Sequence, residues 1–253
     1  MILLLDIGNT HTHVALAFGR RISRGQNWKT EDVRGGLAFG LLESLVGQRR
    51  LKGACLCSVV PMATQPIQDA LQKLTGFSAL QLGPETIRGV GIDYPKPASI
   101  GQDRLANAVA ARHRFGAPVL VVDFGTAVTF DVVDRAGNYI GGVIAPGLAA
   151  MTDYLHEKTA LLPRIRIREP RSAIGKDTEH AMLVGAVHGY RGLVRQVIRE
   201  VKGELGARRL PVVATGGYAK LMARGVTEIT EVCPGLTLEG LRLTWEAHQA
   251  GLK

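Results

Sequence analysis

Short apolar runs alternate with segments of helical periodicity along this chain, which is the pattern of an α/β protein. Leu3-Leu4-Leu5 predicts a buried strand that ends at an acidic turn. Further strands are predicted at 11–17, 52–60, 79–82, 118–122, 128–133, 164–168 and 211–214. Helices are predicted at 30–46, 64–74, 105–115, 148–158 and 238–250, and a long helix ends at 200 after a loop over 172–179.

One long segment lacks this periodicity. Residues 83–101 are rich in Gly and Pro, and a stretch of that length inside a folded protein is typical of a functional loop or a lid. It leads into Gly101-Gln102-Asp103-Arg104, which opens the helix predicted at 105–115. Asp103 therefore lies near a helix N-terminus, where an aspartate also serves as an ordinary N-cap. Its position alone leaves both roles open.

A strand, an Asp-x-Gly turn and a second strand occur twice. The first turn is Asp6-Ile7-Gly8-Asn9-Thr10, and the second is Asp123-Phe124-Gly125-Thr126-Ala127. Such a turn can hold phosphate oxygens with backbone N–H groups and a metal ion with its aspartate. One copy alone is more typical of an ordinary hairpin. The repetition is more specific, and two glycine signals accompany it: Gly141-Gly142, expected as a turn before the helix at 148–158, and Thr215-Gly216-Gly217 after a late strand.

Composition narrows the class of protein. With 253 residues, 46% of them hydrophobic, and a mean hydropathy of +0.10, the chain can bury a large core in one domain or two. No apolar run is long enough to span a bilayer and no signal peptide is recognisable, so we expect a cytoplasmic protein without a membrane partner. Its three cysteines form no complete disulfide framework, and we interpret Cys55 and Cys57 as small buried residues.

The net charge of +9 raises the question of nucleic acid. The basic residues are dispersed, and only Arg164-Ile165-Arg166-Ile167-Arg168 is patterned, as a strand with a basic face. No aromatic residues interleave with this run, so a stacking platform for nucleic acid is disfavoured. Attraction of small polyanions such as ATP accounts for the charge equally well.

The duplicated Asp-x-Gly hairpin resembles the actin-like and sugar-kinase superfamily. The resemblance implies two related ribonuclease H-like domains, each a mixed sheet flanked by helices, with the active site in the cleft between them. We expect the first domain at 1–116, with the first phosphate hairpin and the loop before Asp103. The second is expected at 117–253, with the other hairpin and a Gly-Gly turn against the nucleoside. The last helix is expected to pack back on the first domain.

The ordered set of motifs is similar to that of type III pantothenate kinases. It consists of Asp6 to Thr10, Tyr94 ahead of Gly101-Gln102-Asp103-Arg104, Asp123 to Ala127, Gly141-Gly142 with Pro146-Gly147, Gly175-Lys176-Asp177-Thr178, and Thr215-Gly216-Gly217. The resemblance implies ATP-dependent phosphorylation of pantothenate, the first step of coenzyme A biosynthesis. It also implies a homodimer that needs a divalent cation and a monovalent cation.

Site roles follow from the same resemblance. It assigns the ATP phosphates to Asp6, Ile7, Gly8, Asn9, Thr10, His11, Thr12 and His13, and a divalent cation such as Mg²⁺ to Asp6. It assigns ATP also to Thr126, and a monovalent cation, K⁺ or NH₄⁺, to Asp123. Pantothenate is assigned to Tyr94, Gly101, Gln102, Asp103, Arg104 and Thr178, with Asp103 as the general base.

These roles are chemically sensible. A positioned carboxylate can take the proton of the attacking hydroxyl, and Arg104 offers a bidentate fork to a carboxylate or a phosphate. Gln102 departs from the family pattern, where a smaller apolar residue is commoner. His11 and His13 share one strand face, but no third ligand lies near them in the sequence, which disfavours a metal site there.

Two other readings remain open. One is a different actin-like phosphotransferase acting on a small molecule such as a sugar, and the Gly-x-Asp-Arg element argues against it. The other is a non-catalytic nucleotide-binding regulator. The presence of Asp6, Asp103 and Asp123 together argues against that, because a protein without catalysis has little use for three carboxylates in one site.

Overall fold

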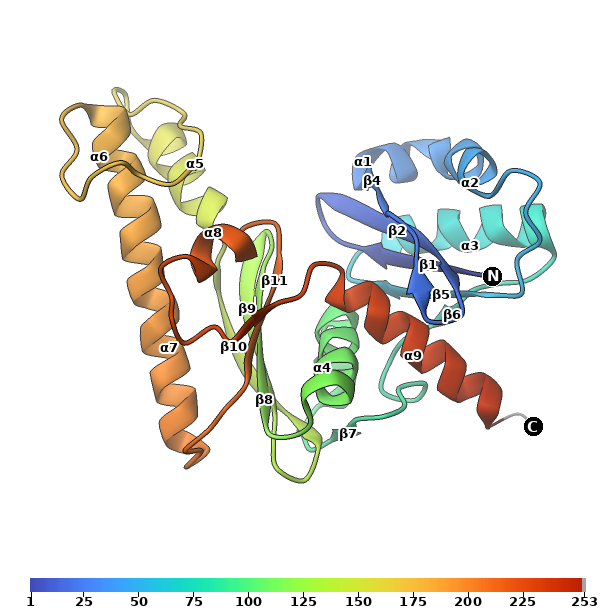
Figure 1. The fold of residues 1–253 in the computed structure, drawn as a ribbon. Coiled ribbons are helices and arrows are strands. Elements are labelled where there is room, and N and C mark those ends of the chain that lie inside the picture. Colours follow the sequence, from blue (N-terminus) through green and yellow to red (C-terminus); the bar gives the residue numbers. More distant parts are fainter. Residues whose placement is uncertain (252–253) are drawn as a thin grey trace. The chain divides into compact units, whose positions relative to one another are not determined.

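The computed structural model describes residues 1–251 of the chain, which divides into two compact units. Unit 1 is Met1–Arg114 together with the C-terminal segment from Leu236 onward, and unit 2 is Phe115–Gly235. Each unit contains one mixed sheet with helices packed against it (Figure 1).

The sheet of unit 1 has the strand order β3-β2-β1-β5-β6, with β4 also paired to β2. The strands are β1 (Ile2–Ile7), β2 (His11–Phe18), β3 (Arg21–Ile22), β4 (Gln26–Lys29), β5 (Ala54–Ser58) and β6 (Leu80–Gln81). β1 pairs antiparallel with β2 and parallel with β5. The central strand is thus flanked by the partner in its own hairpin and by a strand that follows much later in the sequence.

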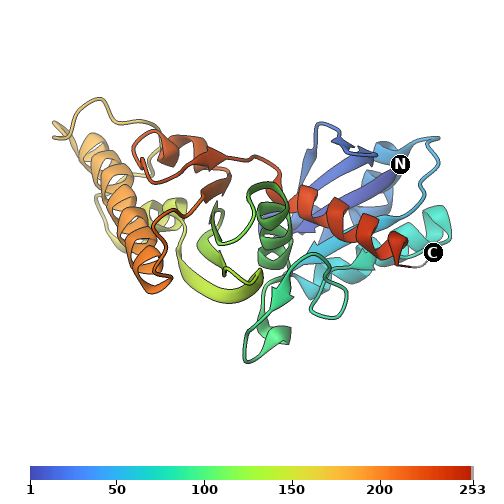
Figure 2. The same cartoon turned by 60° about the horizontal axis from the view of Figure 1, so that its bottom comes forward.

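Helices cover both faces of this sheet. They are α1 (Thr30–Asp32), η1 (Val33–Leu37), α2 (Ala38–Val46), α3 (Pro61–Thr75), α4 (Gln102–Phe115) and α9 (Leu236–Ala250). Leu3, Leu5 and Ile7 belong to one buried cluster with residues of α2 and α3. Ala15 of β2 points to the opposite face of the alternating strands, and a Cβ atom on Gly25 would lie 3.9 Å from Ala15 and 4.0 Å from Leu238 of α9. Contacts of α9 with β1, β2 and β5 agree with both views (Figure 1, Figure 2).

Two features of the sequence set the ends and the course of these helices. α3 begins at Pro61, which suits the first turn of a helix because the N–H group that proline lacks would have no partner there. The helix is followed by Gly76, whose φ of 78° makes it a left-handed cap. The helix predicted at 30–46 is interrupted at Gly36, whose φ of 93° breaks regular helical geometry. The segment predicted as a loop at 83–101 contains only β7 (Gly91–Ile92) and the short helix η2 (Pro97–Ser99).

α9 crosses α4 closely. Gly240 lies against the backbone carbonyl of Ala106, where a Cβ atom would have no space. Beside this crossing, the buried hydroxyl of Thr237 is 2.9 Å from Oδ1 of the buried Asn107. The start of α4, which carries Asp103, is thus part of a helix held within unit 1.

The sheet of unit 2 includes strands in the order β12-β11-β8-β9-β10. These are β8 (Val119–Phe124), β9 (Ala127–Val133), β10 (Asn138–Pro146), β11 (Val212–Gly216) and β12 (Glu231–Val232). β8 pairs antiparallel with β9 and parallel with β11, as β1 does with β2 and β5. The helices of this unit are α5 (Leu148–Lys158), α6 (Thr178–Val184), η3 (Gly185–Gly189), α7 (Tyr190–Glu204) and α8 (Ala219–Ala223). The core of the unit forms where side chains of these helices pack with those of β8 and β9; they include Leu183, Val187, Tyr190 and Val194.

Two local predictions for unit 2 are wrong. Gly141 and Gly142 are not a turn but lie inside β10, where their φ values of 120° and 158° accompany a register shift. Residues 164–168 form no strand, because their backbone pairs with no neighbouring strand and only the alternation of Arg and Ile resembled one. Among residues 1–251, no helix is both long and apolar enough to cross a membrane.

Candidate active site

The first Asp-x-Gly turn is a tight hairpin between β1 and β2. Asp6 lies opposite His13 of β2 and opposite Cys57 of β5. The N–H of Gly8 donates to the carbonyl of His11 at 3.0 Å, and a Cβ atom on Gly8 would come within 3.0 Å of that same oxygen. Glycine is therefore the residue that this turn accommodates most easily.

Two buried threonines hold the turn from behind. The hydroxyl of Thr30 donates to the carbonyl of Gly8 at 2.7 Å, and its backbone N–H donates to the carbonyl of Thr10 at 3.1 Å. The hydroxyl of Thr12 is 3.0 Å from that of Thr30, and both side chains are excluded from solvent. The turn is thus fixed at two carbonyls, and Asn9 and Thr10 remain exposed at its tip.

Asp6 shares its surroundings with a thiol and a second carboxylate. The Sγ–H of Cys57 donates to Oδ1 of Asp6 at 3.4 Å. Burial and, to a smaller extent, the negative charge of Asp103 together raise the pKa of Asp6 to about 7, while the hydrogen bond from Cys57 opposes the shift. Burial and the nearby carboxylates raise the pKa of Cys57 well above its usual value, so the thiol keeps its proton and acts as a donor.

Asp103 lies in the first turn of α4, one residue after its start. Its Oδ1 accepts the backbone N–H of Arg104 at 2.9 Å. Burial raises the pKa of Asp103, while the N–H and the positive charge of Arg104 counteract the shift. A Cβ atom on Gly101 would lie 2.6 Å from Oδ1 of Asp103, so the glycine leaves the space that this carboxylate occupies.

The second Asp-x-Gly turn has its own supports in unit 2. The N–H of Gly125 donates to the carbonyl of Ala127 at 3.0 Å, and the N–H of Gly147 donates to the carbonyl of Thr126 at 3.1 Å. Asp123 lies opposite Thr215 of β11. Gly216 follows with a φ of 87°, and a Cβ atom there would lie 2.5 Å from Oδ1 of Asp123. The Thr-Gly-Gly segment and the Asp-x-Gly turn are therefore neighbours.

Comparison with known proteins shows which family this chain belongs to. A family profile of type III pantothenate kinases matches residues 2–200. The type III pantothenate kinase of Akkermansia muciniphila is 47% identical over 242 residues, which are 95% of this chain and 96% of that protein. That of Brevibacillus brevis is 41% identical over 257 residues, covering 99% of this chain and 100% of the other. This chain belongs to the type III pantothenate kinase family.

Solved structures with lower identity share the fold. The inorganic polyphosphate/ATP-glucomannokinase from Arthrobacter sp. strain KM is 13% identical, with a TM-score of 0.52 over 98% of both chains. The ethanolamine utilization protein EutJ from Carboxydothermus hydrogenoformans is 18% identical, with a TM-score of 0.56 over 96% of this chain and 89% of the other. The predicted fold class, two actin-like mixed sheets flanked by helices, is confirmed.

The residues predicted for the pantothenate kinase site fall into three groups. Unit 1 brings together Asp6, the first turn, and the Gly101–Arg104 segment. Tyr94 lies in the same unit, half-buried in the loop before α4. Unit 2 holds Asp123 and Thr126 at the second turn. Thr178 begins α6, where Oδ1 of Asp177 caps the helix by accepting the N–H of His180 at 2.8 Å.

His11 and His13 are exposed on β2, with ring centroids 6.4 Å apart. Nδ1 of His13 is 2.6 Å from Oδ1 of Asn27. Within residues 1–251, no group of three or more His, Cys, Asp or Glu side chains is arranged to hold a metal ion. The histidine pair therefore has no third ligand in the described structure.

The sequence did not assign three residues of this region to the site: Thr30, Cys57 and Ser58. The carbonyl oxygen Oε1 of Gln102 accepts the N–H of Ser58 at 2.9 Å, which ties the start of α4 to the end of β5. A signal for Cys57 and Ser58 was present, since they end a predicted strand. The ends of parallel strands meet at one edge of a sheet, where ligands bind in open α/β folds. No local pattern marked Thr30 as a support of the turn.

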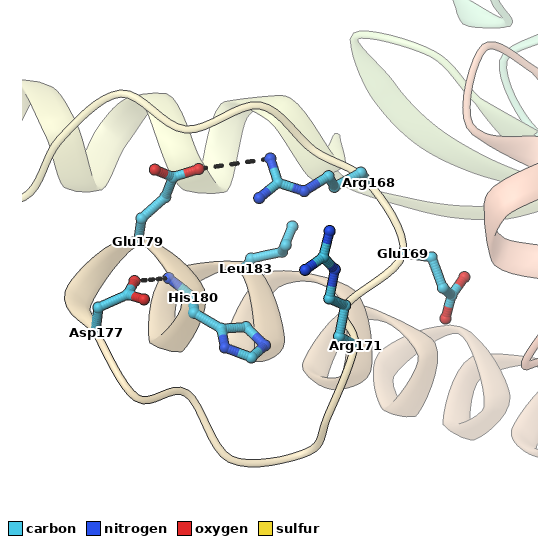
Figure 3. A pocket seen from close by; sticks show the side chains of 7 residues that line it. All are labelled: Arg168, Glu169, Arg171, Asp177, Glu179, His180 and Leu183. Atoms are coloured by element: carbon cyan, nitrogen blue, oxygen red, sulfur yellow. Dashed lines mark hydrogen bonds and ion pairs between the residues drawn. The ribbon is translucent and has the colours of Figure 1, made fainter.

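A small cavity of about 240 Å³ lies near the start of α6 in unit 2 (Figure 3). Arg168 and Glu179 form an ion pair across it at 3.5 Å, and Glu169 is bound to Arg191 by two hydrogen bonds of 2.8 Å. Arg171 and the ring of His180 also line this cavity. Thr178 is not among its lining residues, so the predicted substrate contact and this cavity are different features.

Proposed function

We propose that this protein transfers the γ-phosphoryl group of ATP to the primary hydroxyl of pantothenate. The product is 4'-phosphopantothenate, and the reaction is the first step of coenzyme A biosynthesis. The observation that carries the proposal is the placement of Asp103 within electrostatic reach of Asp6, beside a fixed Asp-x-Gly turn, in a chain of this family.

Asp103 is the proposed general base. Phosphoryl transfer needs an oriented hydroxyl that loses its proton as it attacks, and a carboxylate within reach of that hydroxyl can accept the proton. Burial supports this role because a raised pKa makes the carboxylate a stronger base than one in water. Arg104 and Tyr94 are proposed to bind pantothenate, as are Thr178 and the segment from Gly101 to Gln102.

The first turn is the proposed binding element for the ATP phosphates and a divalent cation. The proposed contacts run from Asp6 through Ile7, Gly8, Asn9 and Thr10 to His13; the N–H of Gly8 is used within the turn, Asn9 and Thr10 are exposed at its tip, and His11 and His13 are exposed on β2. The side chain of Thr12 is buried against Thr30, so we assign it the support of the turn. Asp6 fits a site for Mg²⁺, which proteins commonly bind through one or two carboxylates and the substrate phosphates. When bound, such a cation would neutralise charge on the transferred group.

The second turn has two proposed roles: Thr126 contacts ATP, and Asp123 holds a monovalent cation, K⁺ or NH₄⁺. The carboxylate itself supports the second role: it is half-buried at the end of β8, with its Oδ1 next to Gly216. A replacement of K⁺ by Na⁺ that leaves activity unchanged would argue against it.

The proposed assembly is a homodimer. Met151, Tyr154 and Leu155 occur at helical spacing on α5 and are 38%, 61% and 39% exposed, so they form one apolar face in contact with solvent. Leu161 and Ile174, in the segment between α5 and α6, are 89% and 68% exposed. A second copy of this chain would bury such a surface. An active protein with the mass of one chain in light scattering would contradict the dimer.

A cytoplasmic location is part of the proposal. The buried thiols of Cys55 and Cys57 support it because they form no disulfide.

A coupled assay of ADP formation tests the function. Purified protein is given ATP, Mg²⁺ and K⁺, with pantothenate, with a panel of sugars, or with no acceptor. We expect ADP formation that depends on pantothenate. Activity on a sugar alone would favour another phosphotransferase of this fold, and no acceptor-dependent ADP at all would favour a non-catalytic nucleotide-binding protein.

A further inference from the structure

The end of β5 contacts both acidic elements of unit 1. Cys57 Sγ–H donates to Oδ1 of Asp6, and the N–H of the next residue, Ser58, donates to Oε1 of Gln102. Gln102 immediately precedes Asp103. Two adjacent residues therefore hold the strand that carries one carboxylate and the helical turn that carries the other.

Ser58 is itself well fixed. Its hydroxyl accepts the N–H of Val60 at 3.0 Å and the hydroxyl of Thr64 at 2.6 Å. Thr64 belongs to the first turn of α3, whose core residues pack under the sheet. The backbone N–H that Gln102 contacts is therefore attached to a packed helix.

Gln102 uses its carbonyl oxygen for this tie. Oε1 receives the 2.9 Å hydrogen bond from Ser58 and a longer one of 3.3 Å from Nε2 of Gln81. The Ser58 donor is a half-buried backbone group, whereas the Gln81 contact is exposed. A hydrogen bond in a less hydrated place constrains its partners more strongly, so the Ser58 bond is the one that positions α4.

We propose that Cys57, Ser58 and Gln102 are positioning residues that set where the carboxylates of Asp6 and Asp103 stand for phosphoryl transfer. The inference rests on the proposed function. For Gln102 it replaces the direct contact with pantothenate, which the family resemblance implies, by a role that acts through Asp103, because its Oε1 is bound to Ser58. A displacement of about 1 Å in a reacting group can lower a rate about a hundredfold, so a loosened α4 start is expected to lower turnover.

The first test compares Gln102→Met with Gln81→Met. Methionine keeps the length of Gln102 and removes the acceptor for Ser58, and the control removes the second donor to the same oxygen while leaving the Ser58 bond. We expect Gln102→Met to lower kcat at least about tenfold, with the KM values for ATP and pantothenate within about twofold of wild type. Gln81→Met is expected to keep kcat within about twofold.

The second test compares Cys57→Ala with Cys57→Ser. Alanine removes the donor to Asp6, and serine restores a donor of similar shape. We expect kcat to fall about three- to tenfold in Cys57→Ala and to recover in Cys57→Ser. Equal losses in the two variants would overturn the role of Cys57, because a general packing defect would not distinguish them.

Thermal unfolding of every variant separates positioning from folding. A lowered kcat in variants with the melting temperature of wild type supports the inference. A raised KM for pantothenate with unchanged kcat in Gln102→Met would overturn it in favour of direct substrate contact, and so would unchanged kinetics. If the wild-type protein has no pantothenate-dependent activity, the proposed function is overturned and the positioning role fails with it. If the wild-type protein is active and the variants are unaffected, only the positioning inference is overturned.

Discussion

Asp6 in β1 and Asp123 in β8 occupy matching places in the two units. Each is in a strand that pairs antiparallel with the strand directly after it and parallel with a strand from later in its unit. A glycine two residues on donates its N–H back across the turn in both cases. The turns differ in length, since Gly8 bonds to His11, three residues on, and Gly125 to Ala127, two residues on.

The neighbours of the two carboxylates differ more than the backbones do. The parallel strand beside Asp6 presents the thiol of Cys57, and Asp103 adds a second negative charge. The parallel strand beside Asp123 ends in Gly216, which has no side chain. The same fold element thus lies beside a thiol and a second carboxylate in unit 1 and is packed closely against a glycine in unit 2, a difference set by residues on β5, β11 and α4.

The largest expected effect comes from removing the carboxylate that α4 places near Asp6. Asp103→Asn is expected to lower kcat about 10²–10⁴-fold, because the amide cannot accept the hydroxyl proton. KM for ATP is expected to stay within about twofold, since ATP binding is assigned to other residues. Steady-state kinetics with circular dichroism as the folding control measure this, and near-wild-type turnover would contradict the role of Asp103.

The acidic crowding in unit 1 predicts a pH-dependent stability. The pKa of Asp6 is about 7 in the folded protein against an ordinary value of 3.8, so folding favours the protonated form. The stability this provides is complete below about pH 4 and is lost as the pH rises to about 7. The amide of Asp6→Asn cannot ionise, so this variant does not lose stability as the pH rises. We expect it to be more stable than wild type by about 2–4 kcal/mol at pH 8 and equal to it at pH 4.

Urea unfolding at both pH values, without added divalent cations, measures this difference. Asp69→Asn, at an exposed position on α3, controls for the change in net charge. An Asp6→Asn variant with the same advantage at pH 4 as at pH 8 would show that the gain has another origin.

The close packing beside Asp123 depends on Gly216. Its φ of 87° is unfavourable for other residues, and a Cβ atom would lie 2.7 Å from the backbone of Phe124 as well as 2.5 Å from Asp123. Gly216→Ala is expected to lower the free energy of unfolding by about 2 kcal/mol. Gly217→Ala is the matched control, because a Cβ atom there meets nothing within 4 Å, and its effect is expected within about 0.5 kcal/mol. Equal effects in chemical denaturation would contradict the crowding argument.

The smallest effect is expected at the support of the first turn. Thr30→Val keeps the shape but removes the hydroxyl that bonds to Gly8 and Thr12. The unpaired carbonyl of Gly8 is expected to cost about 1–2 kcal/mol of unfolding free energy. Thr30→Ser keeps the hydroxyl and should retain most of the stability, and a serine variant as unstable as the valine one would assign the role to the methyl group.

The hairpins and helices around both sites could be predicted from the sequence because they depend on local patterns. Apolar runs ending in Asp-x-Gly predicted the two hairpins, and helical spacing predicted α5 at residues 148–158, as observed. Gly141-Gly142 was misassigned because glycine pairs are typical of turns, whereas here they bend a strand. Arg164 to Arg168 alternates like a strand but has no partner strand, and alternation does not reveal pairing.

What surrounds each carboxylate was not predictable in the same way. The contacts of Asp6 with Cys57, and of Gln102 with Ser58, join positions 51 and 44 residues apart. Cys57 was interpreted as a small buried residue, which is correct but omits its hydrogen bond. Such contacts depend on the register between β1 and β5 and on where α4 begins, and neither is encoded in a local pattern.

The most direct measurement is ³¹P NMR of a reaction containing the wild-type protein, ATP, Mg²⁺, K⁺ and pantothenate, with Asp103→Asn in parallel. We expect a phosphomonoester signal, coupled to the methylene protons of the primary alcohol, that grows with ADP in the wild-type reaction and is strongly reduced in the variant. A wild-type reaction that consumes no ATP, or that forms ADP and inorganic phosphate without this ester, would contradict it.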